Sequence, residues 1–419
     1  MFLSRMGRGD YTEPMHRLGA KQAARMIERG ELTGEKLIRA CLERIAARDA
    51  EVKAWVCLNA EAVAQAGSAK APLRGVPVGV KDIFDTYDLP TEYGSRIYAG
   101  YRPRTDAAPV ALTRRAGGVI LGKTVTAEFA TFVPGPTRNP HDLARTPGGS
   151  SSGSAAAVAD CMVPLAFGTQ TAGSVIRPAS YCGVVACKPT YNMLARAGVK
   201  PGADSLDTVG VYARSVEDVA FFLSALTGLQ ISFEPMKPKV GVFRGEAQPA
   251  MEACLDDAAR ALGAREIAFP EHAKLQQAHR AILWYEVARS FADEVTRFPD
   301  GMDATLRARC LDGFNLDAAE YAEAKRVAAA ARASLEHLFG DCDVLLAPAA
   351  TGEAPLGMPT GDVAMNVVWT LLHVPCVAVP AGKGPHGMPL GLQVIGRIGD
   401  DARTLACADW IHSRLKGDT

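Results

Sequence analysis

Three separate segments of the chain carry a lysine and several serines that together could cleave an acyl bond. Lys81 ends an apolar run at 76–80, where partial loss of water would disfavour the ammonium and make the amine available as a base. Serine needs such a base within hydrogen-bond reach, and serines occur in two glycine-rich runs, at 147–154 and 168–174. The second run can turn several backbone N–H groups toward one point, as an oxyanion hole requires. The residues alone leave two interpretations open: this catalytic site, or a surface lysine and two solvated linkers.

A phosphate-binding pattern occurs at 117–124, which reads GGVILGKT and satisfies G-x-x-x-x-G-K-[ST]. The pattern works only where its middle is a flexible loop whose amides wrap a phosphate. Here the middle is Gly-Val-Ile-Leu, which prefers a strand, and the preceding residues 106–116 look helical. We therefore predict a structural strand in this segment rather than a nucleotide site.

A serine-hydrolase pattern, G-x-S-x-G, occurs at 149–153 and is centred on Ser151. In an α/β-hydrolase a buried strand must lead directly into that serine. The preceding residues 137–147 are polar and contain two prolines, so they cannot form such a strand. The context speaks against this hydrolase class, although a histidine partner elsewhere in the chain stays open.

Composition excludes several other classes of function. The 419 residues include 46 Lys and Arg against 46 Asp and Glu, a balance that argues against nucleic acid or an anionic membrane as partner. No apolar run reaches the ~18 residues of a spanning helix, and residues 1–19 lack the apolar core of a secretory signal. The ten cysteines include no Cys-x-x-Cys pair and the eight histidines no His-x-x-x-His pair. We expect a cytoplasmic protein with reduced thiols and no metal site.

Alternating strand and helix patterns predict an α/β protein whose sheet is covered on both faces. Thr33 is the expected N-cap of a helix within 16–50. The segment 134–154 is longer and more polar than an ordinary connecting loop, and loops of that length are usually functional or disordered. Residues 249–340 are mainly helical, and strand material lies on both sides of them, so we interpret them as an excursion from one sheet. The expected strands lie at 73–84, 119–121, 240–243, 343–347, 374–379 and 390–395.

Taken together, the segments resemble the amidase signature family of serine amide hydrolases. The family pattern is a strand ending in Val-Lys-Asp, a Gly-Gly-Ser-Ser loop, and a Gly-Gly-Ser loop whose serine follows 24 residues later, as Ser174 follows Ser150 here. The resemblance covers residues 18 to 419 and implies one α/β/α domain around a large mixed sheet, with 249–340 forming part of the substrate wall. Further matching segments are 75–82 (GVPVGVKD), 121–124 (LGKT), 182–190 (CGVVACKPT) and 387–396 (GMPLGLQVIG).

The resemblance also implies roles for individual residues. Ser174 resembles the nucleophile, Ser150 the bridging serine that follows an unusual cis peptide after Gly149, and Lys81 the base. The mechanism passes through an acyl-enzyme and needs no cofactor and no metal. The implied oxyanion hole consists of the backbone amides of Thr171, Ala172, Gly173 and Ser174.

Two positions depart from the family's common Gly-Thr-Asp-Thr-Gly-Gly-Ser: Gln170 removes a charge near the site, and Ala172 adds a methyl group. Within the family the chain looks most similar to malonamidases and related small bacterial amidases, in which the arginine matching Arg177 holds a substrate carboxylate. A structural ion pair is the alternative role for Arg177. Ser151 and Gln170 are further candidates for substrate contact.

The resemblance therefore implies hydrolysis of a small amide to a carboxylate and ammonia, with a carboxylate-bearing amide such as malonamate as one possibility. The alternatives are the amidase subunit of a tRNA-dependent amidotransferase, or an amidase for another small amide, urea-type or aryl-amide substrate. A non-catalytic scaffold is disfavoured because the lysine and both serines are present. We also expect a homodimer. Possible pocket residues, for each of which base rates favour core packing over ligand contact, are Trp284, Tyr285, Trp369 and His373.

Overall fold

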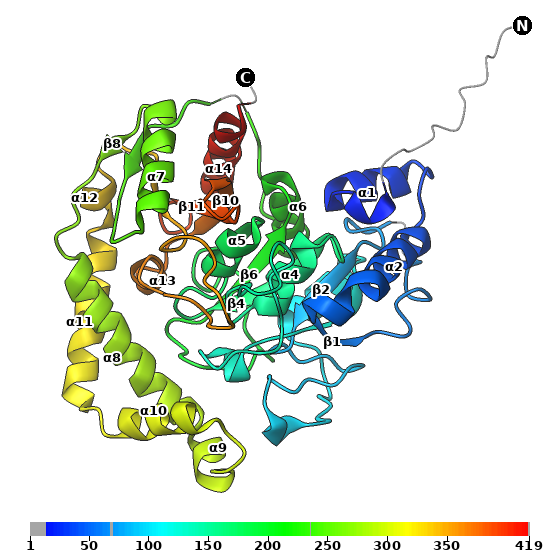
Figure 1. Ribbon diagram of the computed structural model, residues 1–419, viewed down its shortest axis with the longest axis horizontal. Coiled ribbons are helices and arrows are strands. Elements are labelled where there is room, and N and C mark those ends of the chain that lie inside the picture. Colours follow the sequence, from blue (N-terminus) through cyan, green and yellow to red (C-terminus); the bar gives the residue numbers. More distant parts are fainter. Residues whose placement is uncertain (1–13, 68–69, 235, 418–419) are drawn as a thin grey trace, which may run out of the picture.

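One mixed sheet of 11 strands organises the computed structural model, which describes residues 14–67, 70–234 and 236–417 (Figure 1). The spatial order is β1-β3-β2-β4-β6-β5-β10-β11-β9-β7-β8. The sequence predicted no secretory signal in residues 1–19, and most of that segment lies outside the described residues. The strands are β1 (Trp55–Leu58), β2 (Pro77–Lys81), β3 (Val119–Thr124), β4 (Leu165–Gln170), β5 (Val185–Lys188), β6 (Thr208–Ala213), β7 (Val240–Val242), β8 (Arg265–Glu266), β9 (Val344–Pro348), β10 (Cys376–Lys383) and β11 (Pro389–Ile395).

Helices surround this sheet, and the expected α/β architecture is confirmed. Thr33 caps its helix as expected, because its side chain accepts a hydrogen bond from the amide of Lys36 at 3.2 Å. The α-helices are α1 (Ala20–Glu28), α2 (Gly34–Val52), α3 (Ala108–Arg115), α4 (Ser152–Ala159), α5 (Ile176–Cys182), α6 (Val216–Thr227), α7 (Pro249–Leu262), α8 (His272–Ser290), α9 (Ala292–Arg297), α10 (Ala304–Phe314), α11 (Ala318–Ala333), α12 (Leu335–Phe339), α13 (Val367–Leu371) and α14 (Asp401–Lys416). Single 3-10 turns are η1 (Met15–Arg17), η2 (Arg96–Tyr98) and η3 (Glu128–Ala130).

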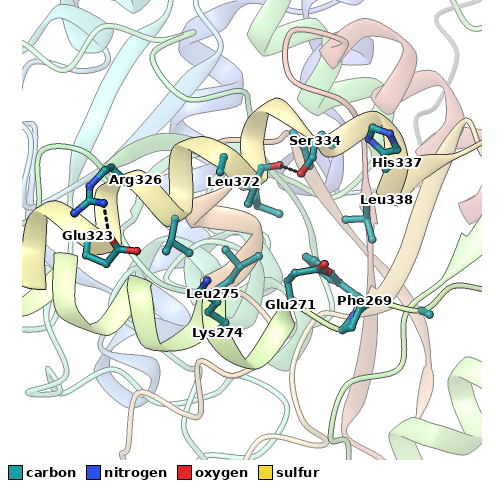
Figure 2. A pocket seen from close by; sticks show the side chains of 16 residues that line it. Phe269, Glu271, Lys274, Leu275, Glu323, Arg326, Ser334, His337, Leu338 and Leu372 are labelled. Carbon is teal, nitrogen blue, oxygen red and sulfur yellow. Dashed lines mark hydrogen bonds and ion pairs between the residues drawn. The ribbon is translucent and has the colours of Figure 1, made fainter.

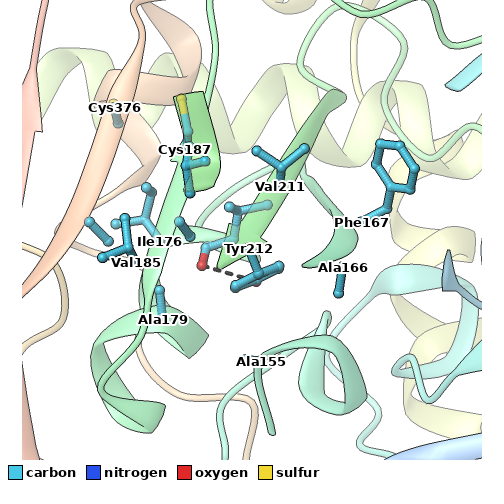
Figure 3. Packing of buried hydrophobic residues seen from close by; sticks show 14 of the residues in the cluster. Ala155, Ala166, Phe167, Ile176, Ala179, Val185, Cys187, Val211, Tyr212 and Cys376 are labelled. Carbon is cyan, nitrogen blue, oxygen red and sulfur yellow. Dashed lines mark hydrogen bonds between the residues drawn. The ribbon is translucent and has the colours of Figure 1, made fainter. Parts of the chain in front are cut away.

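Strand pairing shows that helices lie on both faces of the sheet. In the pairing of β4 with β6, Phe167 lies opposite Val211, and Tyr212 is the next residue of β6. Because successive side chains point to opposite faces, Phe167 and Tyr212 are on different sides (Figure 3). Phe167 packs on Phe222 of α6, with ring centroids 5.0 Å apart. The Tyr212 hydroxyl instead donates to backbone carbonyls at the start of α5, so α5 and α6 cover opposite faces.

The direction of β2 and β4 decides where the chemical groups gather. These two strands run parallel and adjacent, with Val80 opposite Phe167. The carboxyl ends of parallel neighbours lie at the same edge of a sheet, which is where ligands bind in open α/β sheets. Lys81 ends β2 and Gln170 ends β4, so the segment that follows β4 begins beside Lys81.

The stretch between β7 and β9 is helical apart from the two-residue strand β8, which pairs with β7 at the sheet edge. Helix α7 packs against β9, β10 and β11. Helix α8 packs instead against α10, α11 and α13, and the long α8–α11 pair lies at the margin of the molecule away from α1 and α2 (Figure 1). The segment 249–340 is mainly helical and lies between two parts of one sheet, as expected. The short strand β8 within it was not expected.

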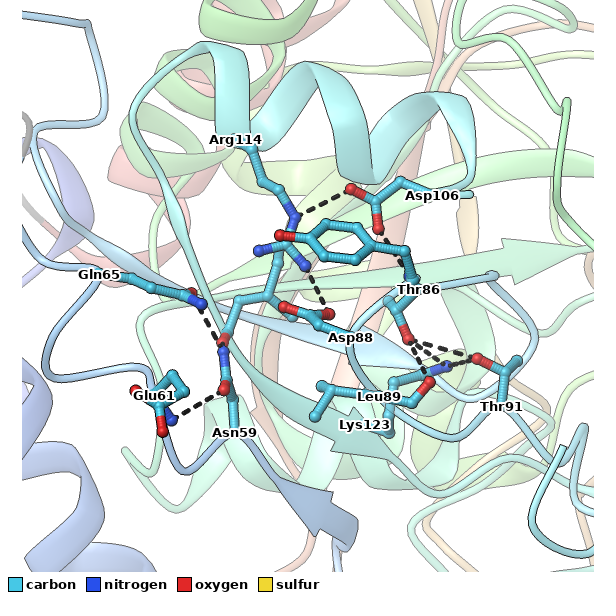
Figure 4. A network of polar contacts seen from close by, with 12 residues as sticks. Asn59, Glu61, Gln65, Thr86, Asp88, Leu89, Thr91, Asp106, Arg114 and Lys123 are labelled. Atoms are coloured by element: carbon cyan, nitrogen blue, oxygen red, sulfur yellow. Dashed lines mark hydrogen bonds and ion pairs between the residues drawn. The ribbon is translucent and has the colours of Figure 1, made fainter. Parts of the chain in front are cut away.

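The phosphate-loop pattern is part of the sheet, as expected, because all of it after the first two glycines forms β3, which is buried throughout. The Lys123 ammonium points into a network of polar groups on the 84–91 segment (Figure 4). It donates to the carbonyl of Phe84 at 2.7 Å and to the hydroxyl of Thr91 at 2.6 Å. It also pairs with the carboxylate of Asp82 at 3.0 Å. These contacts give Lys123 a structural role.

Candidate active site

The Lys81 amine lies between two hydroxyl groups inside the protein. Its Nζ is 2.9 Å from Ser150 Oγ and 2.8 Å from Thr169 Oγ1. Both Lys81 and Ser150 have no exposed surface. Ser150 immediately precedes the buried first turn of α4, and the peptide bond between Gly149 and Ser150 is cis. Three segments distant in sequence therefore bring one amine and two hydroxyls together at the carboxyl ends of β2 and β4.

Burial changes the protonation of Lys81. Removal from water lowers the pKa of this amine well below its ordinary value of 10.5, and the more distant charge of Asp207 only partly opposes the shift. Lys123 is equally buried, and burial lowers its pKa too, but the contacting carboxylate of Asp82 counteracts the effect. No carboxylate contacts Lys81 among the described residues. Its neutral form is therefore favoured, and a neutral amine can accept a proton.

Ser174 follows β4 directly and opens on a cavity of about 470 Å³. Its side chain is 7% exposed, and no hydrogen bond to its hydroxyl occurs within the described part of the chain. Thr171, Ala172 and Arg177 line the same cavity. The structure thus gathers the predicted nucleophile and two of the predicted oxyanion residues around one space that a substrate could enter.

The loop 171–174 is fixed by hydrogen bonds to its outward carbonyl groups. His279 of α8 lies with Nε2 2.9 Å from the carbonyl oxygen of Thr171. Thr370 of α13 donates from Oγ1 to the carbonyl of Ala172 at 2.7 Å. Burial lowers the pKa of His279 to about 4, so the ring is neutral at pH 7 and must donate its single N–H to that carbonyl. A hydrogen bond to a carbonyl also strengthens the N–H of the same peptide group as a donor.

Glycine is required at position 173 of this loop. A Cβ there would come within 2.4 Å of Asn366 Oδ1 and 3.0 Å of Arg177 Nη1. The methyl group of Ala172, by contrast, belongs to a half-buried residue that lines the cavity. The departure from the family pattern at 172 is therefore accommodated on the open side of the loop.

Gln170 and Ser151 do not lie where substrate contacts were predicted. Gln170 is fully buried and spans the loop: its Oε1 accepts from the amides of Val175 and Ile176 at 2.9 and 3.0 Å, and its Nε2 donates to Thr370 Oγ1 at 2.9 Å. Ser151 is fully buried, and its hydroxyl is hydrogen-bonded to the backbone of Thr169 and to the side chain of Tyr212. Neither lines the cavity, and the contacts that both side chains make are with the backbone and side chains around the loop.

Arg177 is buried at the inner end of the cavity and is bound to backbone carbonyls. Its Nε donates to Thr360 at 2.7 Å, Nη1 to Asp362 at 3.2 Å and Nη2 to Gly149 at 2.5 Å. Burial lowers the pKa of its guanidinium. Arginine carries five N–H donors, so these three bonds do not use all of them. The side chain joins the 149–150 peptide to the 360–362 segment and still faces the cavity.

Sequence reasoning missed three residues that position the loop: Asp207, His279 and Thr370. Asp207 accepts the hydroxyl of Thr171, and the other two hold the carbonyls described above. No local pattern marks them, because each reaches the loop from a distant element. Of the four possible pocket residues from the sequence, only Trp284 lines the cavity. The other three pack elsewhere: Trp369 against Phe243 and Phe269, Tyr285 against Tyr321 and His373 against Tyr191.

A second, larger cavity of about 800 Å³ lies between α8, α11 and α12 (Figure 2). Its lining includes Phe269, Leu275 and Leu338, together with charged residues such as Lys274. None of the predicted catalytic or substrate-binding residues lines it. Within the described ranges we find no group of three His, Cys, Asp or Glu side chains that could hold a metal, and no helix long and apolar enough to cross a membrane.

Comparison with known proteins places this site in context. Residues 36–249 and 245–405 match the family model described as Amidase. The chain is similar to the A subunit of the glutamyl-tRNA(Gln) amidotransferase of Anaeromyxobacter sp. (strain K). The two are 33% identical over 95% of this chain and 96% of that relative.

Solved structures share the fold along the whole length. One is a chain from a vestigial protein complex said to reveal the evolutionary origins of an s-triazine catabolic enzyme. It matches with a TM-score of 0.88 and 30% identity over 96% of this chain and 98% of its own. Peptide amidase from Stenotrophomonas maltophilia matches with a TM-score of 0.85 and 26% identity over 96% of this chain and 98% of its own.

Proposed function

The chain belongs to the amidase family, and on that premise we propose that it hydrolyses an amide to a carboxylate and ammonia with Lys81, Ser150 and Ser174. The observation that carries the proposal is the buried amine of Lys81, 2.9 Å from Ser150 Oγ and without a carboxylate in contact among the described residues. A lysine held in this way is poised to accept a proton rather than to pair with a charge.

In the proposed reaction, the Ser174 oxygen attacks the amide carbonyl while its proton passes to Ser150, and the Ser150 proton passes to neutral Lys81. The oxyanion of the tetrahedral intermediate accepts hydrogen bonds from backbone amides of 171–174. The C–N bond then breaks as the relay returns a proton to the nitrogen, which leaves as ammonia. Water attacks the acyl-enzyme, its proton enters the relay, and Ser174 leaves as the hydroxyl.

Covalent labelling tests this proposal directly. A fluorophosphonate should label the purified wild-type chain at Ser174, and Ser174→Ala should lose both the label and ammonia release. Ser151→Ala is the matched control, because Ser151 is buried nearby without facing the cavity. Equal labelling of wild type and Ser174→Ala would reject Ser174 as the nucleophile.

A second candidate function is the amidase subunit of a tRNA-dependent amidotransferase. The similarity to the A subunit of a glutamyl-tRNA(Gln) amidotransferase over 95% of the chain favours it and supports it better than it supports a malonamidase. Such a subunit would need a partner and a path for ammonia. If the purified chain alone hydrolyses small amides without a partner or ATP, this candidate is set aside. If ammonia release from glutamine requires added partner subunits, it is favoured.

The prediction that Arg177 binds a substrate carboxylate remains a proposal, supported by its place on the cavity and its unused N–H groups. Arg177→Ala should then reduce hydrolysis of malonamate far more than hydrolysis of a neutral analogue such as butanamide. An equal loss of activity on both amides would leave only the structural role for Arg177.

The homodimer and the cytoplasmic location also remain predictions. Light scattering on the purified chain would test whether it forms a dimer.

A further inference from the structure

One face of α8 forms a continuous wall of the active-site cavity. The residues that line it recur at helical spacing: Gln276, His279, Arg280, Leu283, Trp284 and Val287. Because intervals of three and four residues return to the same side of a helix, these side chains form one stripe. The stripe is polar through 280 and apolar from 283 onward.

The polar part of the stripe lies at the reacting groups. His279 contacts the carbonyl of Thr171 in the oxyanion loop, which fixes the position of the helix relative to Ser174. Each residue advances a helix by about 1.5 Å, so the apolar stretch from Leu283 to Val287 extends roughly 6–12 Å beyond His279. An apolar surface therefore begins about one helical turn along α8 from the residue that contacts the oxyanion loop.

A second segment adds aromatic surface to the cavity. Phe129 and Phe132 also line the cavity. Phe132 packs edge-on against Trp284 with ring centroids 6.1 Å apart, and Phe129 packs on Phe291 just after α8. Leu283, Trp284 and Phe132 are only half-buried, so their apolar surface is partly uncovered within the structure.

The volume of the cavity exceeds what a two- or three-carbon acid amide fills. About 470 Å³ lies in the range of ~300–1,000 Å³ found for sites that hold drug-sized ligands. Charged side chains of both signs, Arg280 with Glu246 and Asp362, are exposed where they line it. They mark the mouth of the cavity. Arg280 lies one helical turn before Trp284, and the lining residues from Leu283 to Val287 carry no charge.

We propose that the substrate is an amide whose acyl part carries an apolar chain or aromatic ring, seated between Trp284 and Leu283 of α8 and Phe132. The inference rests on the proposed hydrolytic function and assigns its substrate class. The amide group lies at Ser174 and the oxyanion loop, and the apolar group extends along α8 toward Val287. Burial of that group against aromatic side chains supplies binding energy that a short polar acid amide lacks.

The test compares amides that differ in the apolar group. Ammonia release by the purified chain is measured with acetamide, malonamate, L-glutamine, hexanamide and 3-phenylpropanamide. The last two should show kcat/KM at least roughly tenfold above the first three, since each buried methylene in an apolar pocket changes discrimination by about tenfold or more. A higher kcat/KM for malonamate or L-glutamine than for both apolar amides overturns the inference.

Substitution of Trp284 tests whether the preference for apolar amides comes from the α8 side of the cavity. Trp284→Ala should lower kcat/KM for 3-phenylpropanamide by roughly tenfold while changing that for acetamide less than about threefold. Trp284→Phe, which keeps an aromatic surface, serves as a second variant that should fold and retain most of the preference. Trp410→Ala is the matched control, because Trp410 is a half-buried tryptophan of α14 outside the cavity. The assignment of Trp284 to the apolar subsite is overturned if Trp284→Ala loses the same factor of kcat/KM on acetamide as on 3-phenylpropanamide while Trp284→Phe matches the wild type on both amides.

Failure of the inference and failure of the proposed function give different results. If the chain is labelled at Ser174 by a fluorophosphonate and hydrolyses only small polar amides, the function stands and the apolar substrate class is rejected. If no amide yields ammonia and Ser174 is not labelled, the proposed function fails and the inference falls with it.

Discussion

At the scale of single residues, two of the fully buried lysines, Lys81 and Lys123, lie on the adjacent strands β2 and β3 and differ in what contacts them. Lys123 has the carboxylate of Asp82 at 3.0 Å, and a buried cation paired in this way is held as a structural group. Among the described residues, the hydrogen-bond partners of Lys81 are the hydroxyls of Ser150 and Thr169. The same amino acid therefore serves as an ion-pair partner at one position and as a candidate base at the other.

The first prediction concerns the base itself. Lys81→Met keeps most of the apolar volume and removes the amine, so kcat should fall by roughly 10²–10⁴-fold, the usual contribution of general-base catalysis. KM for the best amide should change little. Thr169→Val removes the other hydroxyl partner of the amine and leaves both serines, so its loss of kcat should be much smaller. Unchanged turnover in Lys81→Met, measured by ammonia release, would remove the basis of the mechanism.

A second prediction concerns pH. Activity requires neutral Lys81, so kcat/KM should fall as the pH drops through the pKa of this amine, which burial places well below 10.5. The charge of Asp207 raises that pKa. Asp207→Asn should therefore move the acidic limb of the kcat/KM profile to lower pH. If the acidic limb of the kcat/KM profile stays in place or moves to higher pH in Asp207→Asn, the assignment of that limb to Lys81 is contradicted.

At the scale of elements, the oxyanion loop is a short connection from β4 to α5 whose shape depends on its neighbours. Gln170 at the end of β4 caps the amides of Val175 and Ile176 and also donates to Thr370 of α13. Thr370 in turn donates to the carbonyl of Ala172. Because the amide group of Gln170 donates to the Thr370 oxygen, the single hydroxyl proton of Thr370 goes to a carbonyl group, and the Ala172 carbonyl at 2.7 Å is closer than that of Asn366 at 3.2 Å. The glutamine at a position where the family commonly has aspartate thus sets the direction of this chain of hydrogen bonds.

The third prediction follows from that chain. Thr370→Val has nearly the same shape but leaves the Ala172 carbonyl and the Gln170 amide without their partner. The kcat should fall by roughly tenfold as the loop loses its fixed position, with a smaller change in KM. Thr370→Ser restores the hydroxyl and should recover most of the kcat. If Thr370→Ser is as impaired as Thr370→Val, packing of the methyl group rather than the hydrogen bond explains the effect.

At the scale of the whole molecule, ion pairs connect α2 near the N-terminus with α4, the helix that begins just after Ser150. Asp160 caps the end of α4 and is only 2% exposed. Its carboxylate pairs with Arg44 and with Arg48, both on α2, the second at 3.0 Å. This contact joins α2 to α4, which packs against β2, β3 and β4 of the sheet, as expected for one α/β domain.

The fourth prediction tests that connection. Asp160→Asn should lower the free energy of unfolding by about 1–3 kcal/mol, because two arginines lose a buried charged acceptor. Asp257→Asn is the control, since its pair with Arg260 is exposed on both sides and should contribute less than about 0.5 kcal/mol. Chemical denaturation followed by two spectroscopic probes measures both and also shows whether the chain unfolds in one transition. Equal stability of the two variants would argue against a structural role for the α2–α4 contact.

The sequence by itself determined the α/β class, most of the strands and the segments that hold Lys81, Ser150 and Ser174. It could do so because strands and glycine-rich loops are encoded by neighbouring residues: apolar alternation, turn residues and short motifs act over a few positions. It also assigned the phosphate-loop pattern at 117–124 to a strand, because its middle is apolar.

Only the tertiary structure decided which side chains surround those groups. Gln170 lies close to Ser174 in sequence and Ser151 directly follows Ser150, yet both side chains are fully buried and neither lines the cavity. His279 and Thr370 are far away in sequence and reach the loop through packing of α8 and α13. The direction in which a side chain points, and the loss of water that lowers the pKa of Lys81, depend on contacts between distant segments. Those contacts exist only once the sheet has brought the segments together.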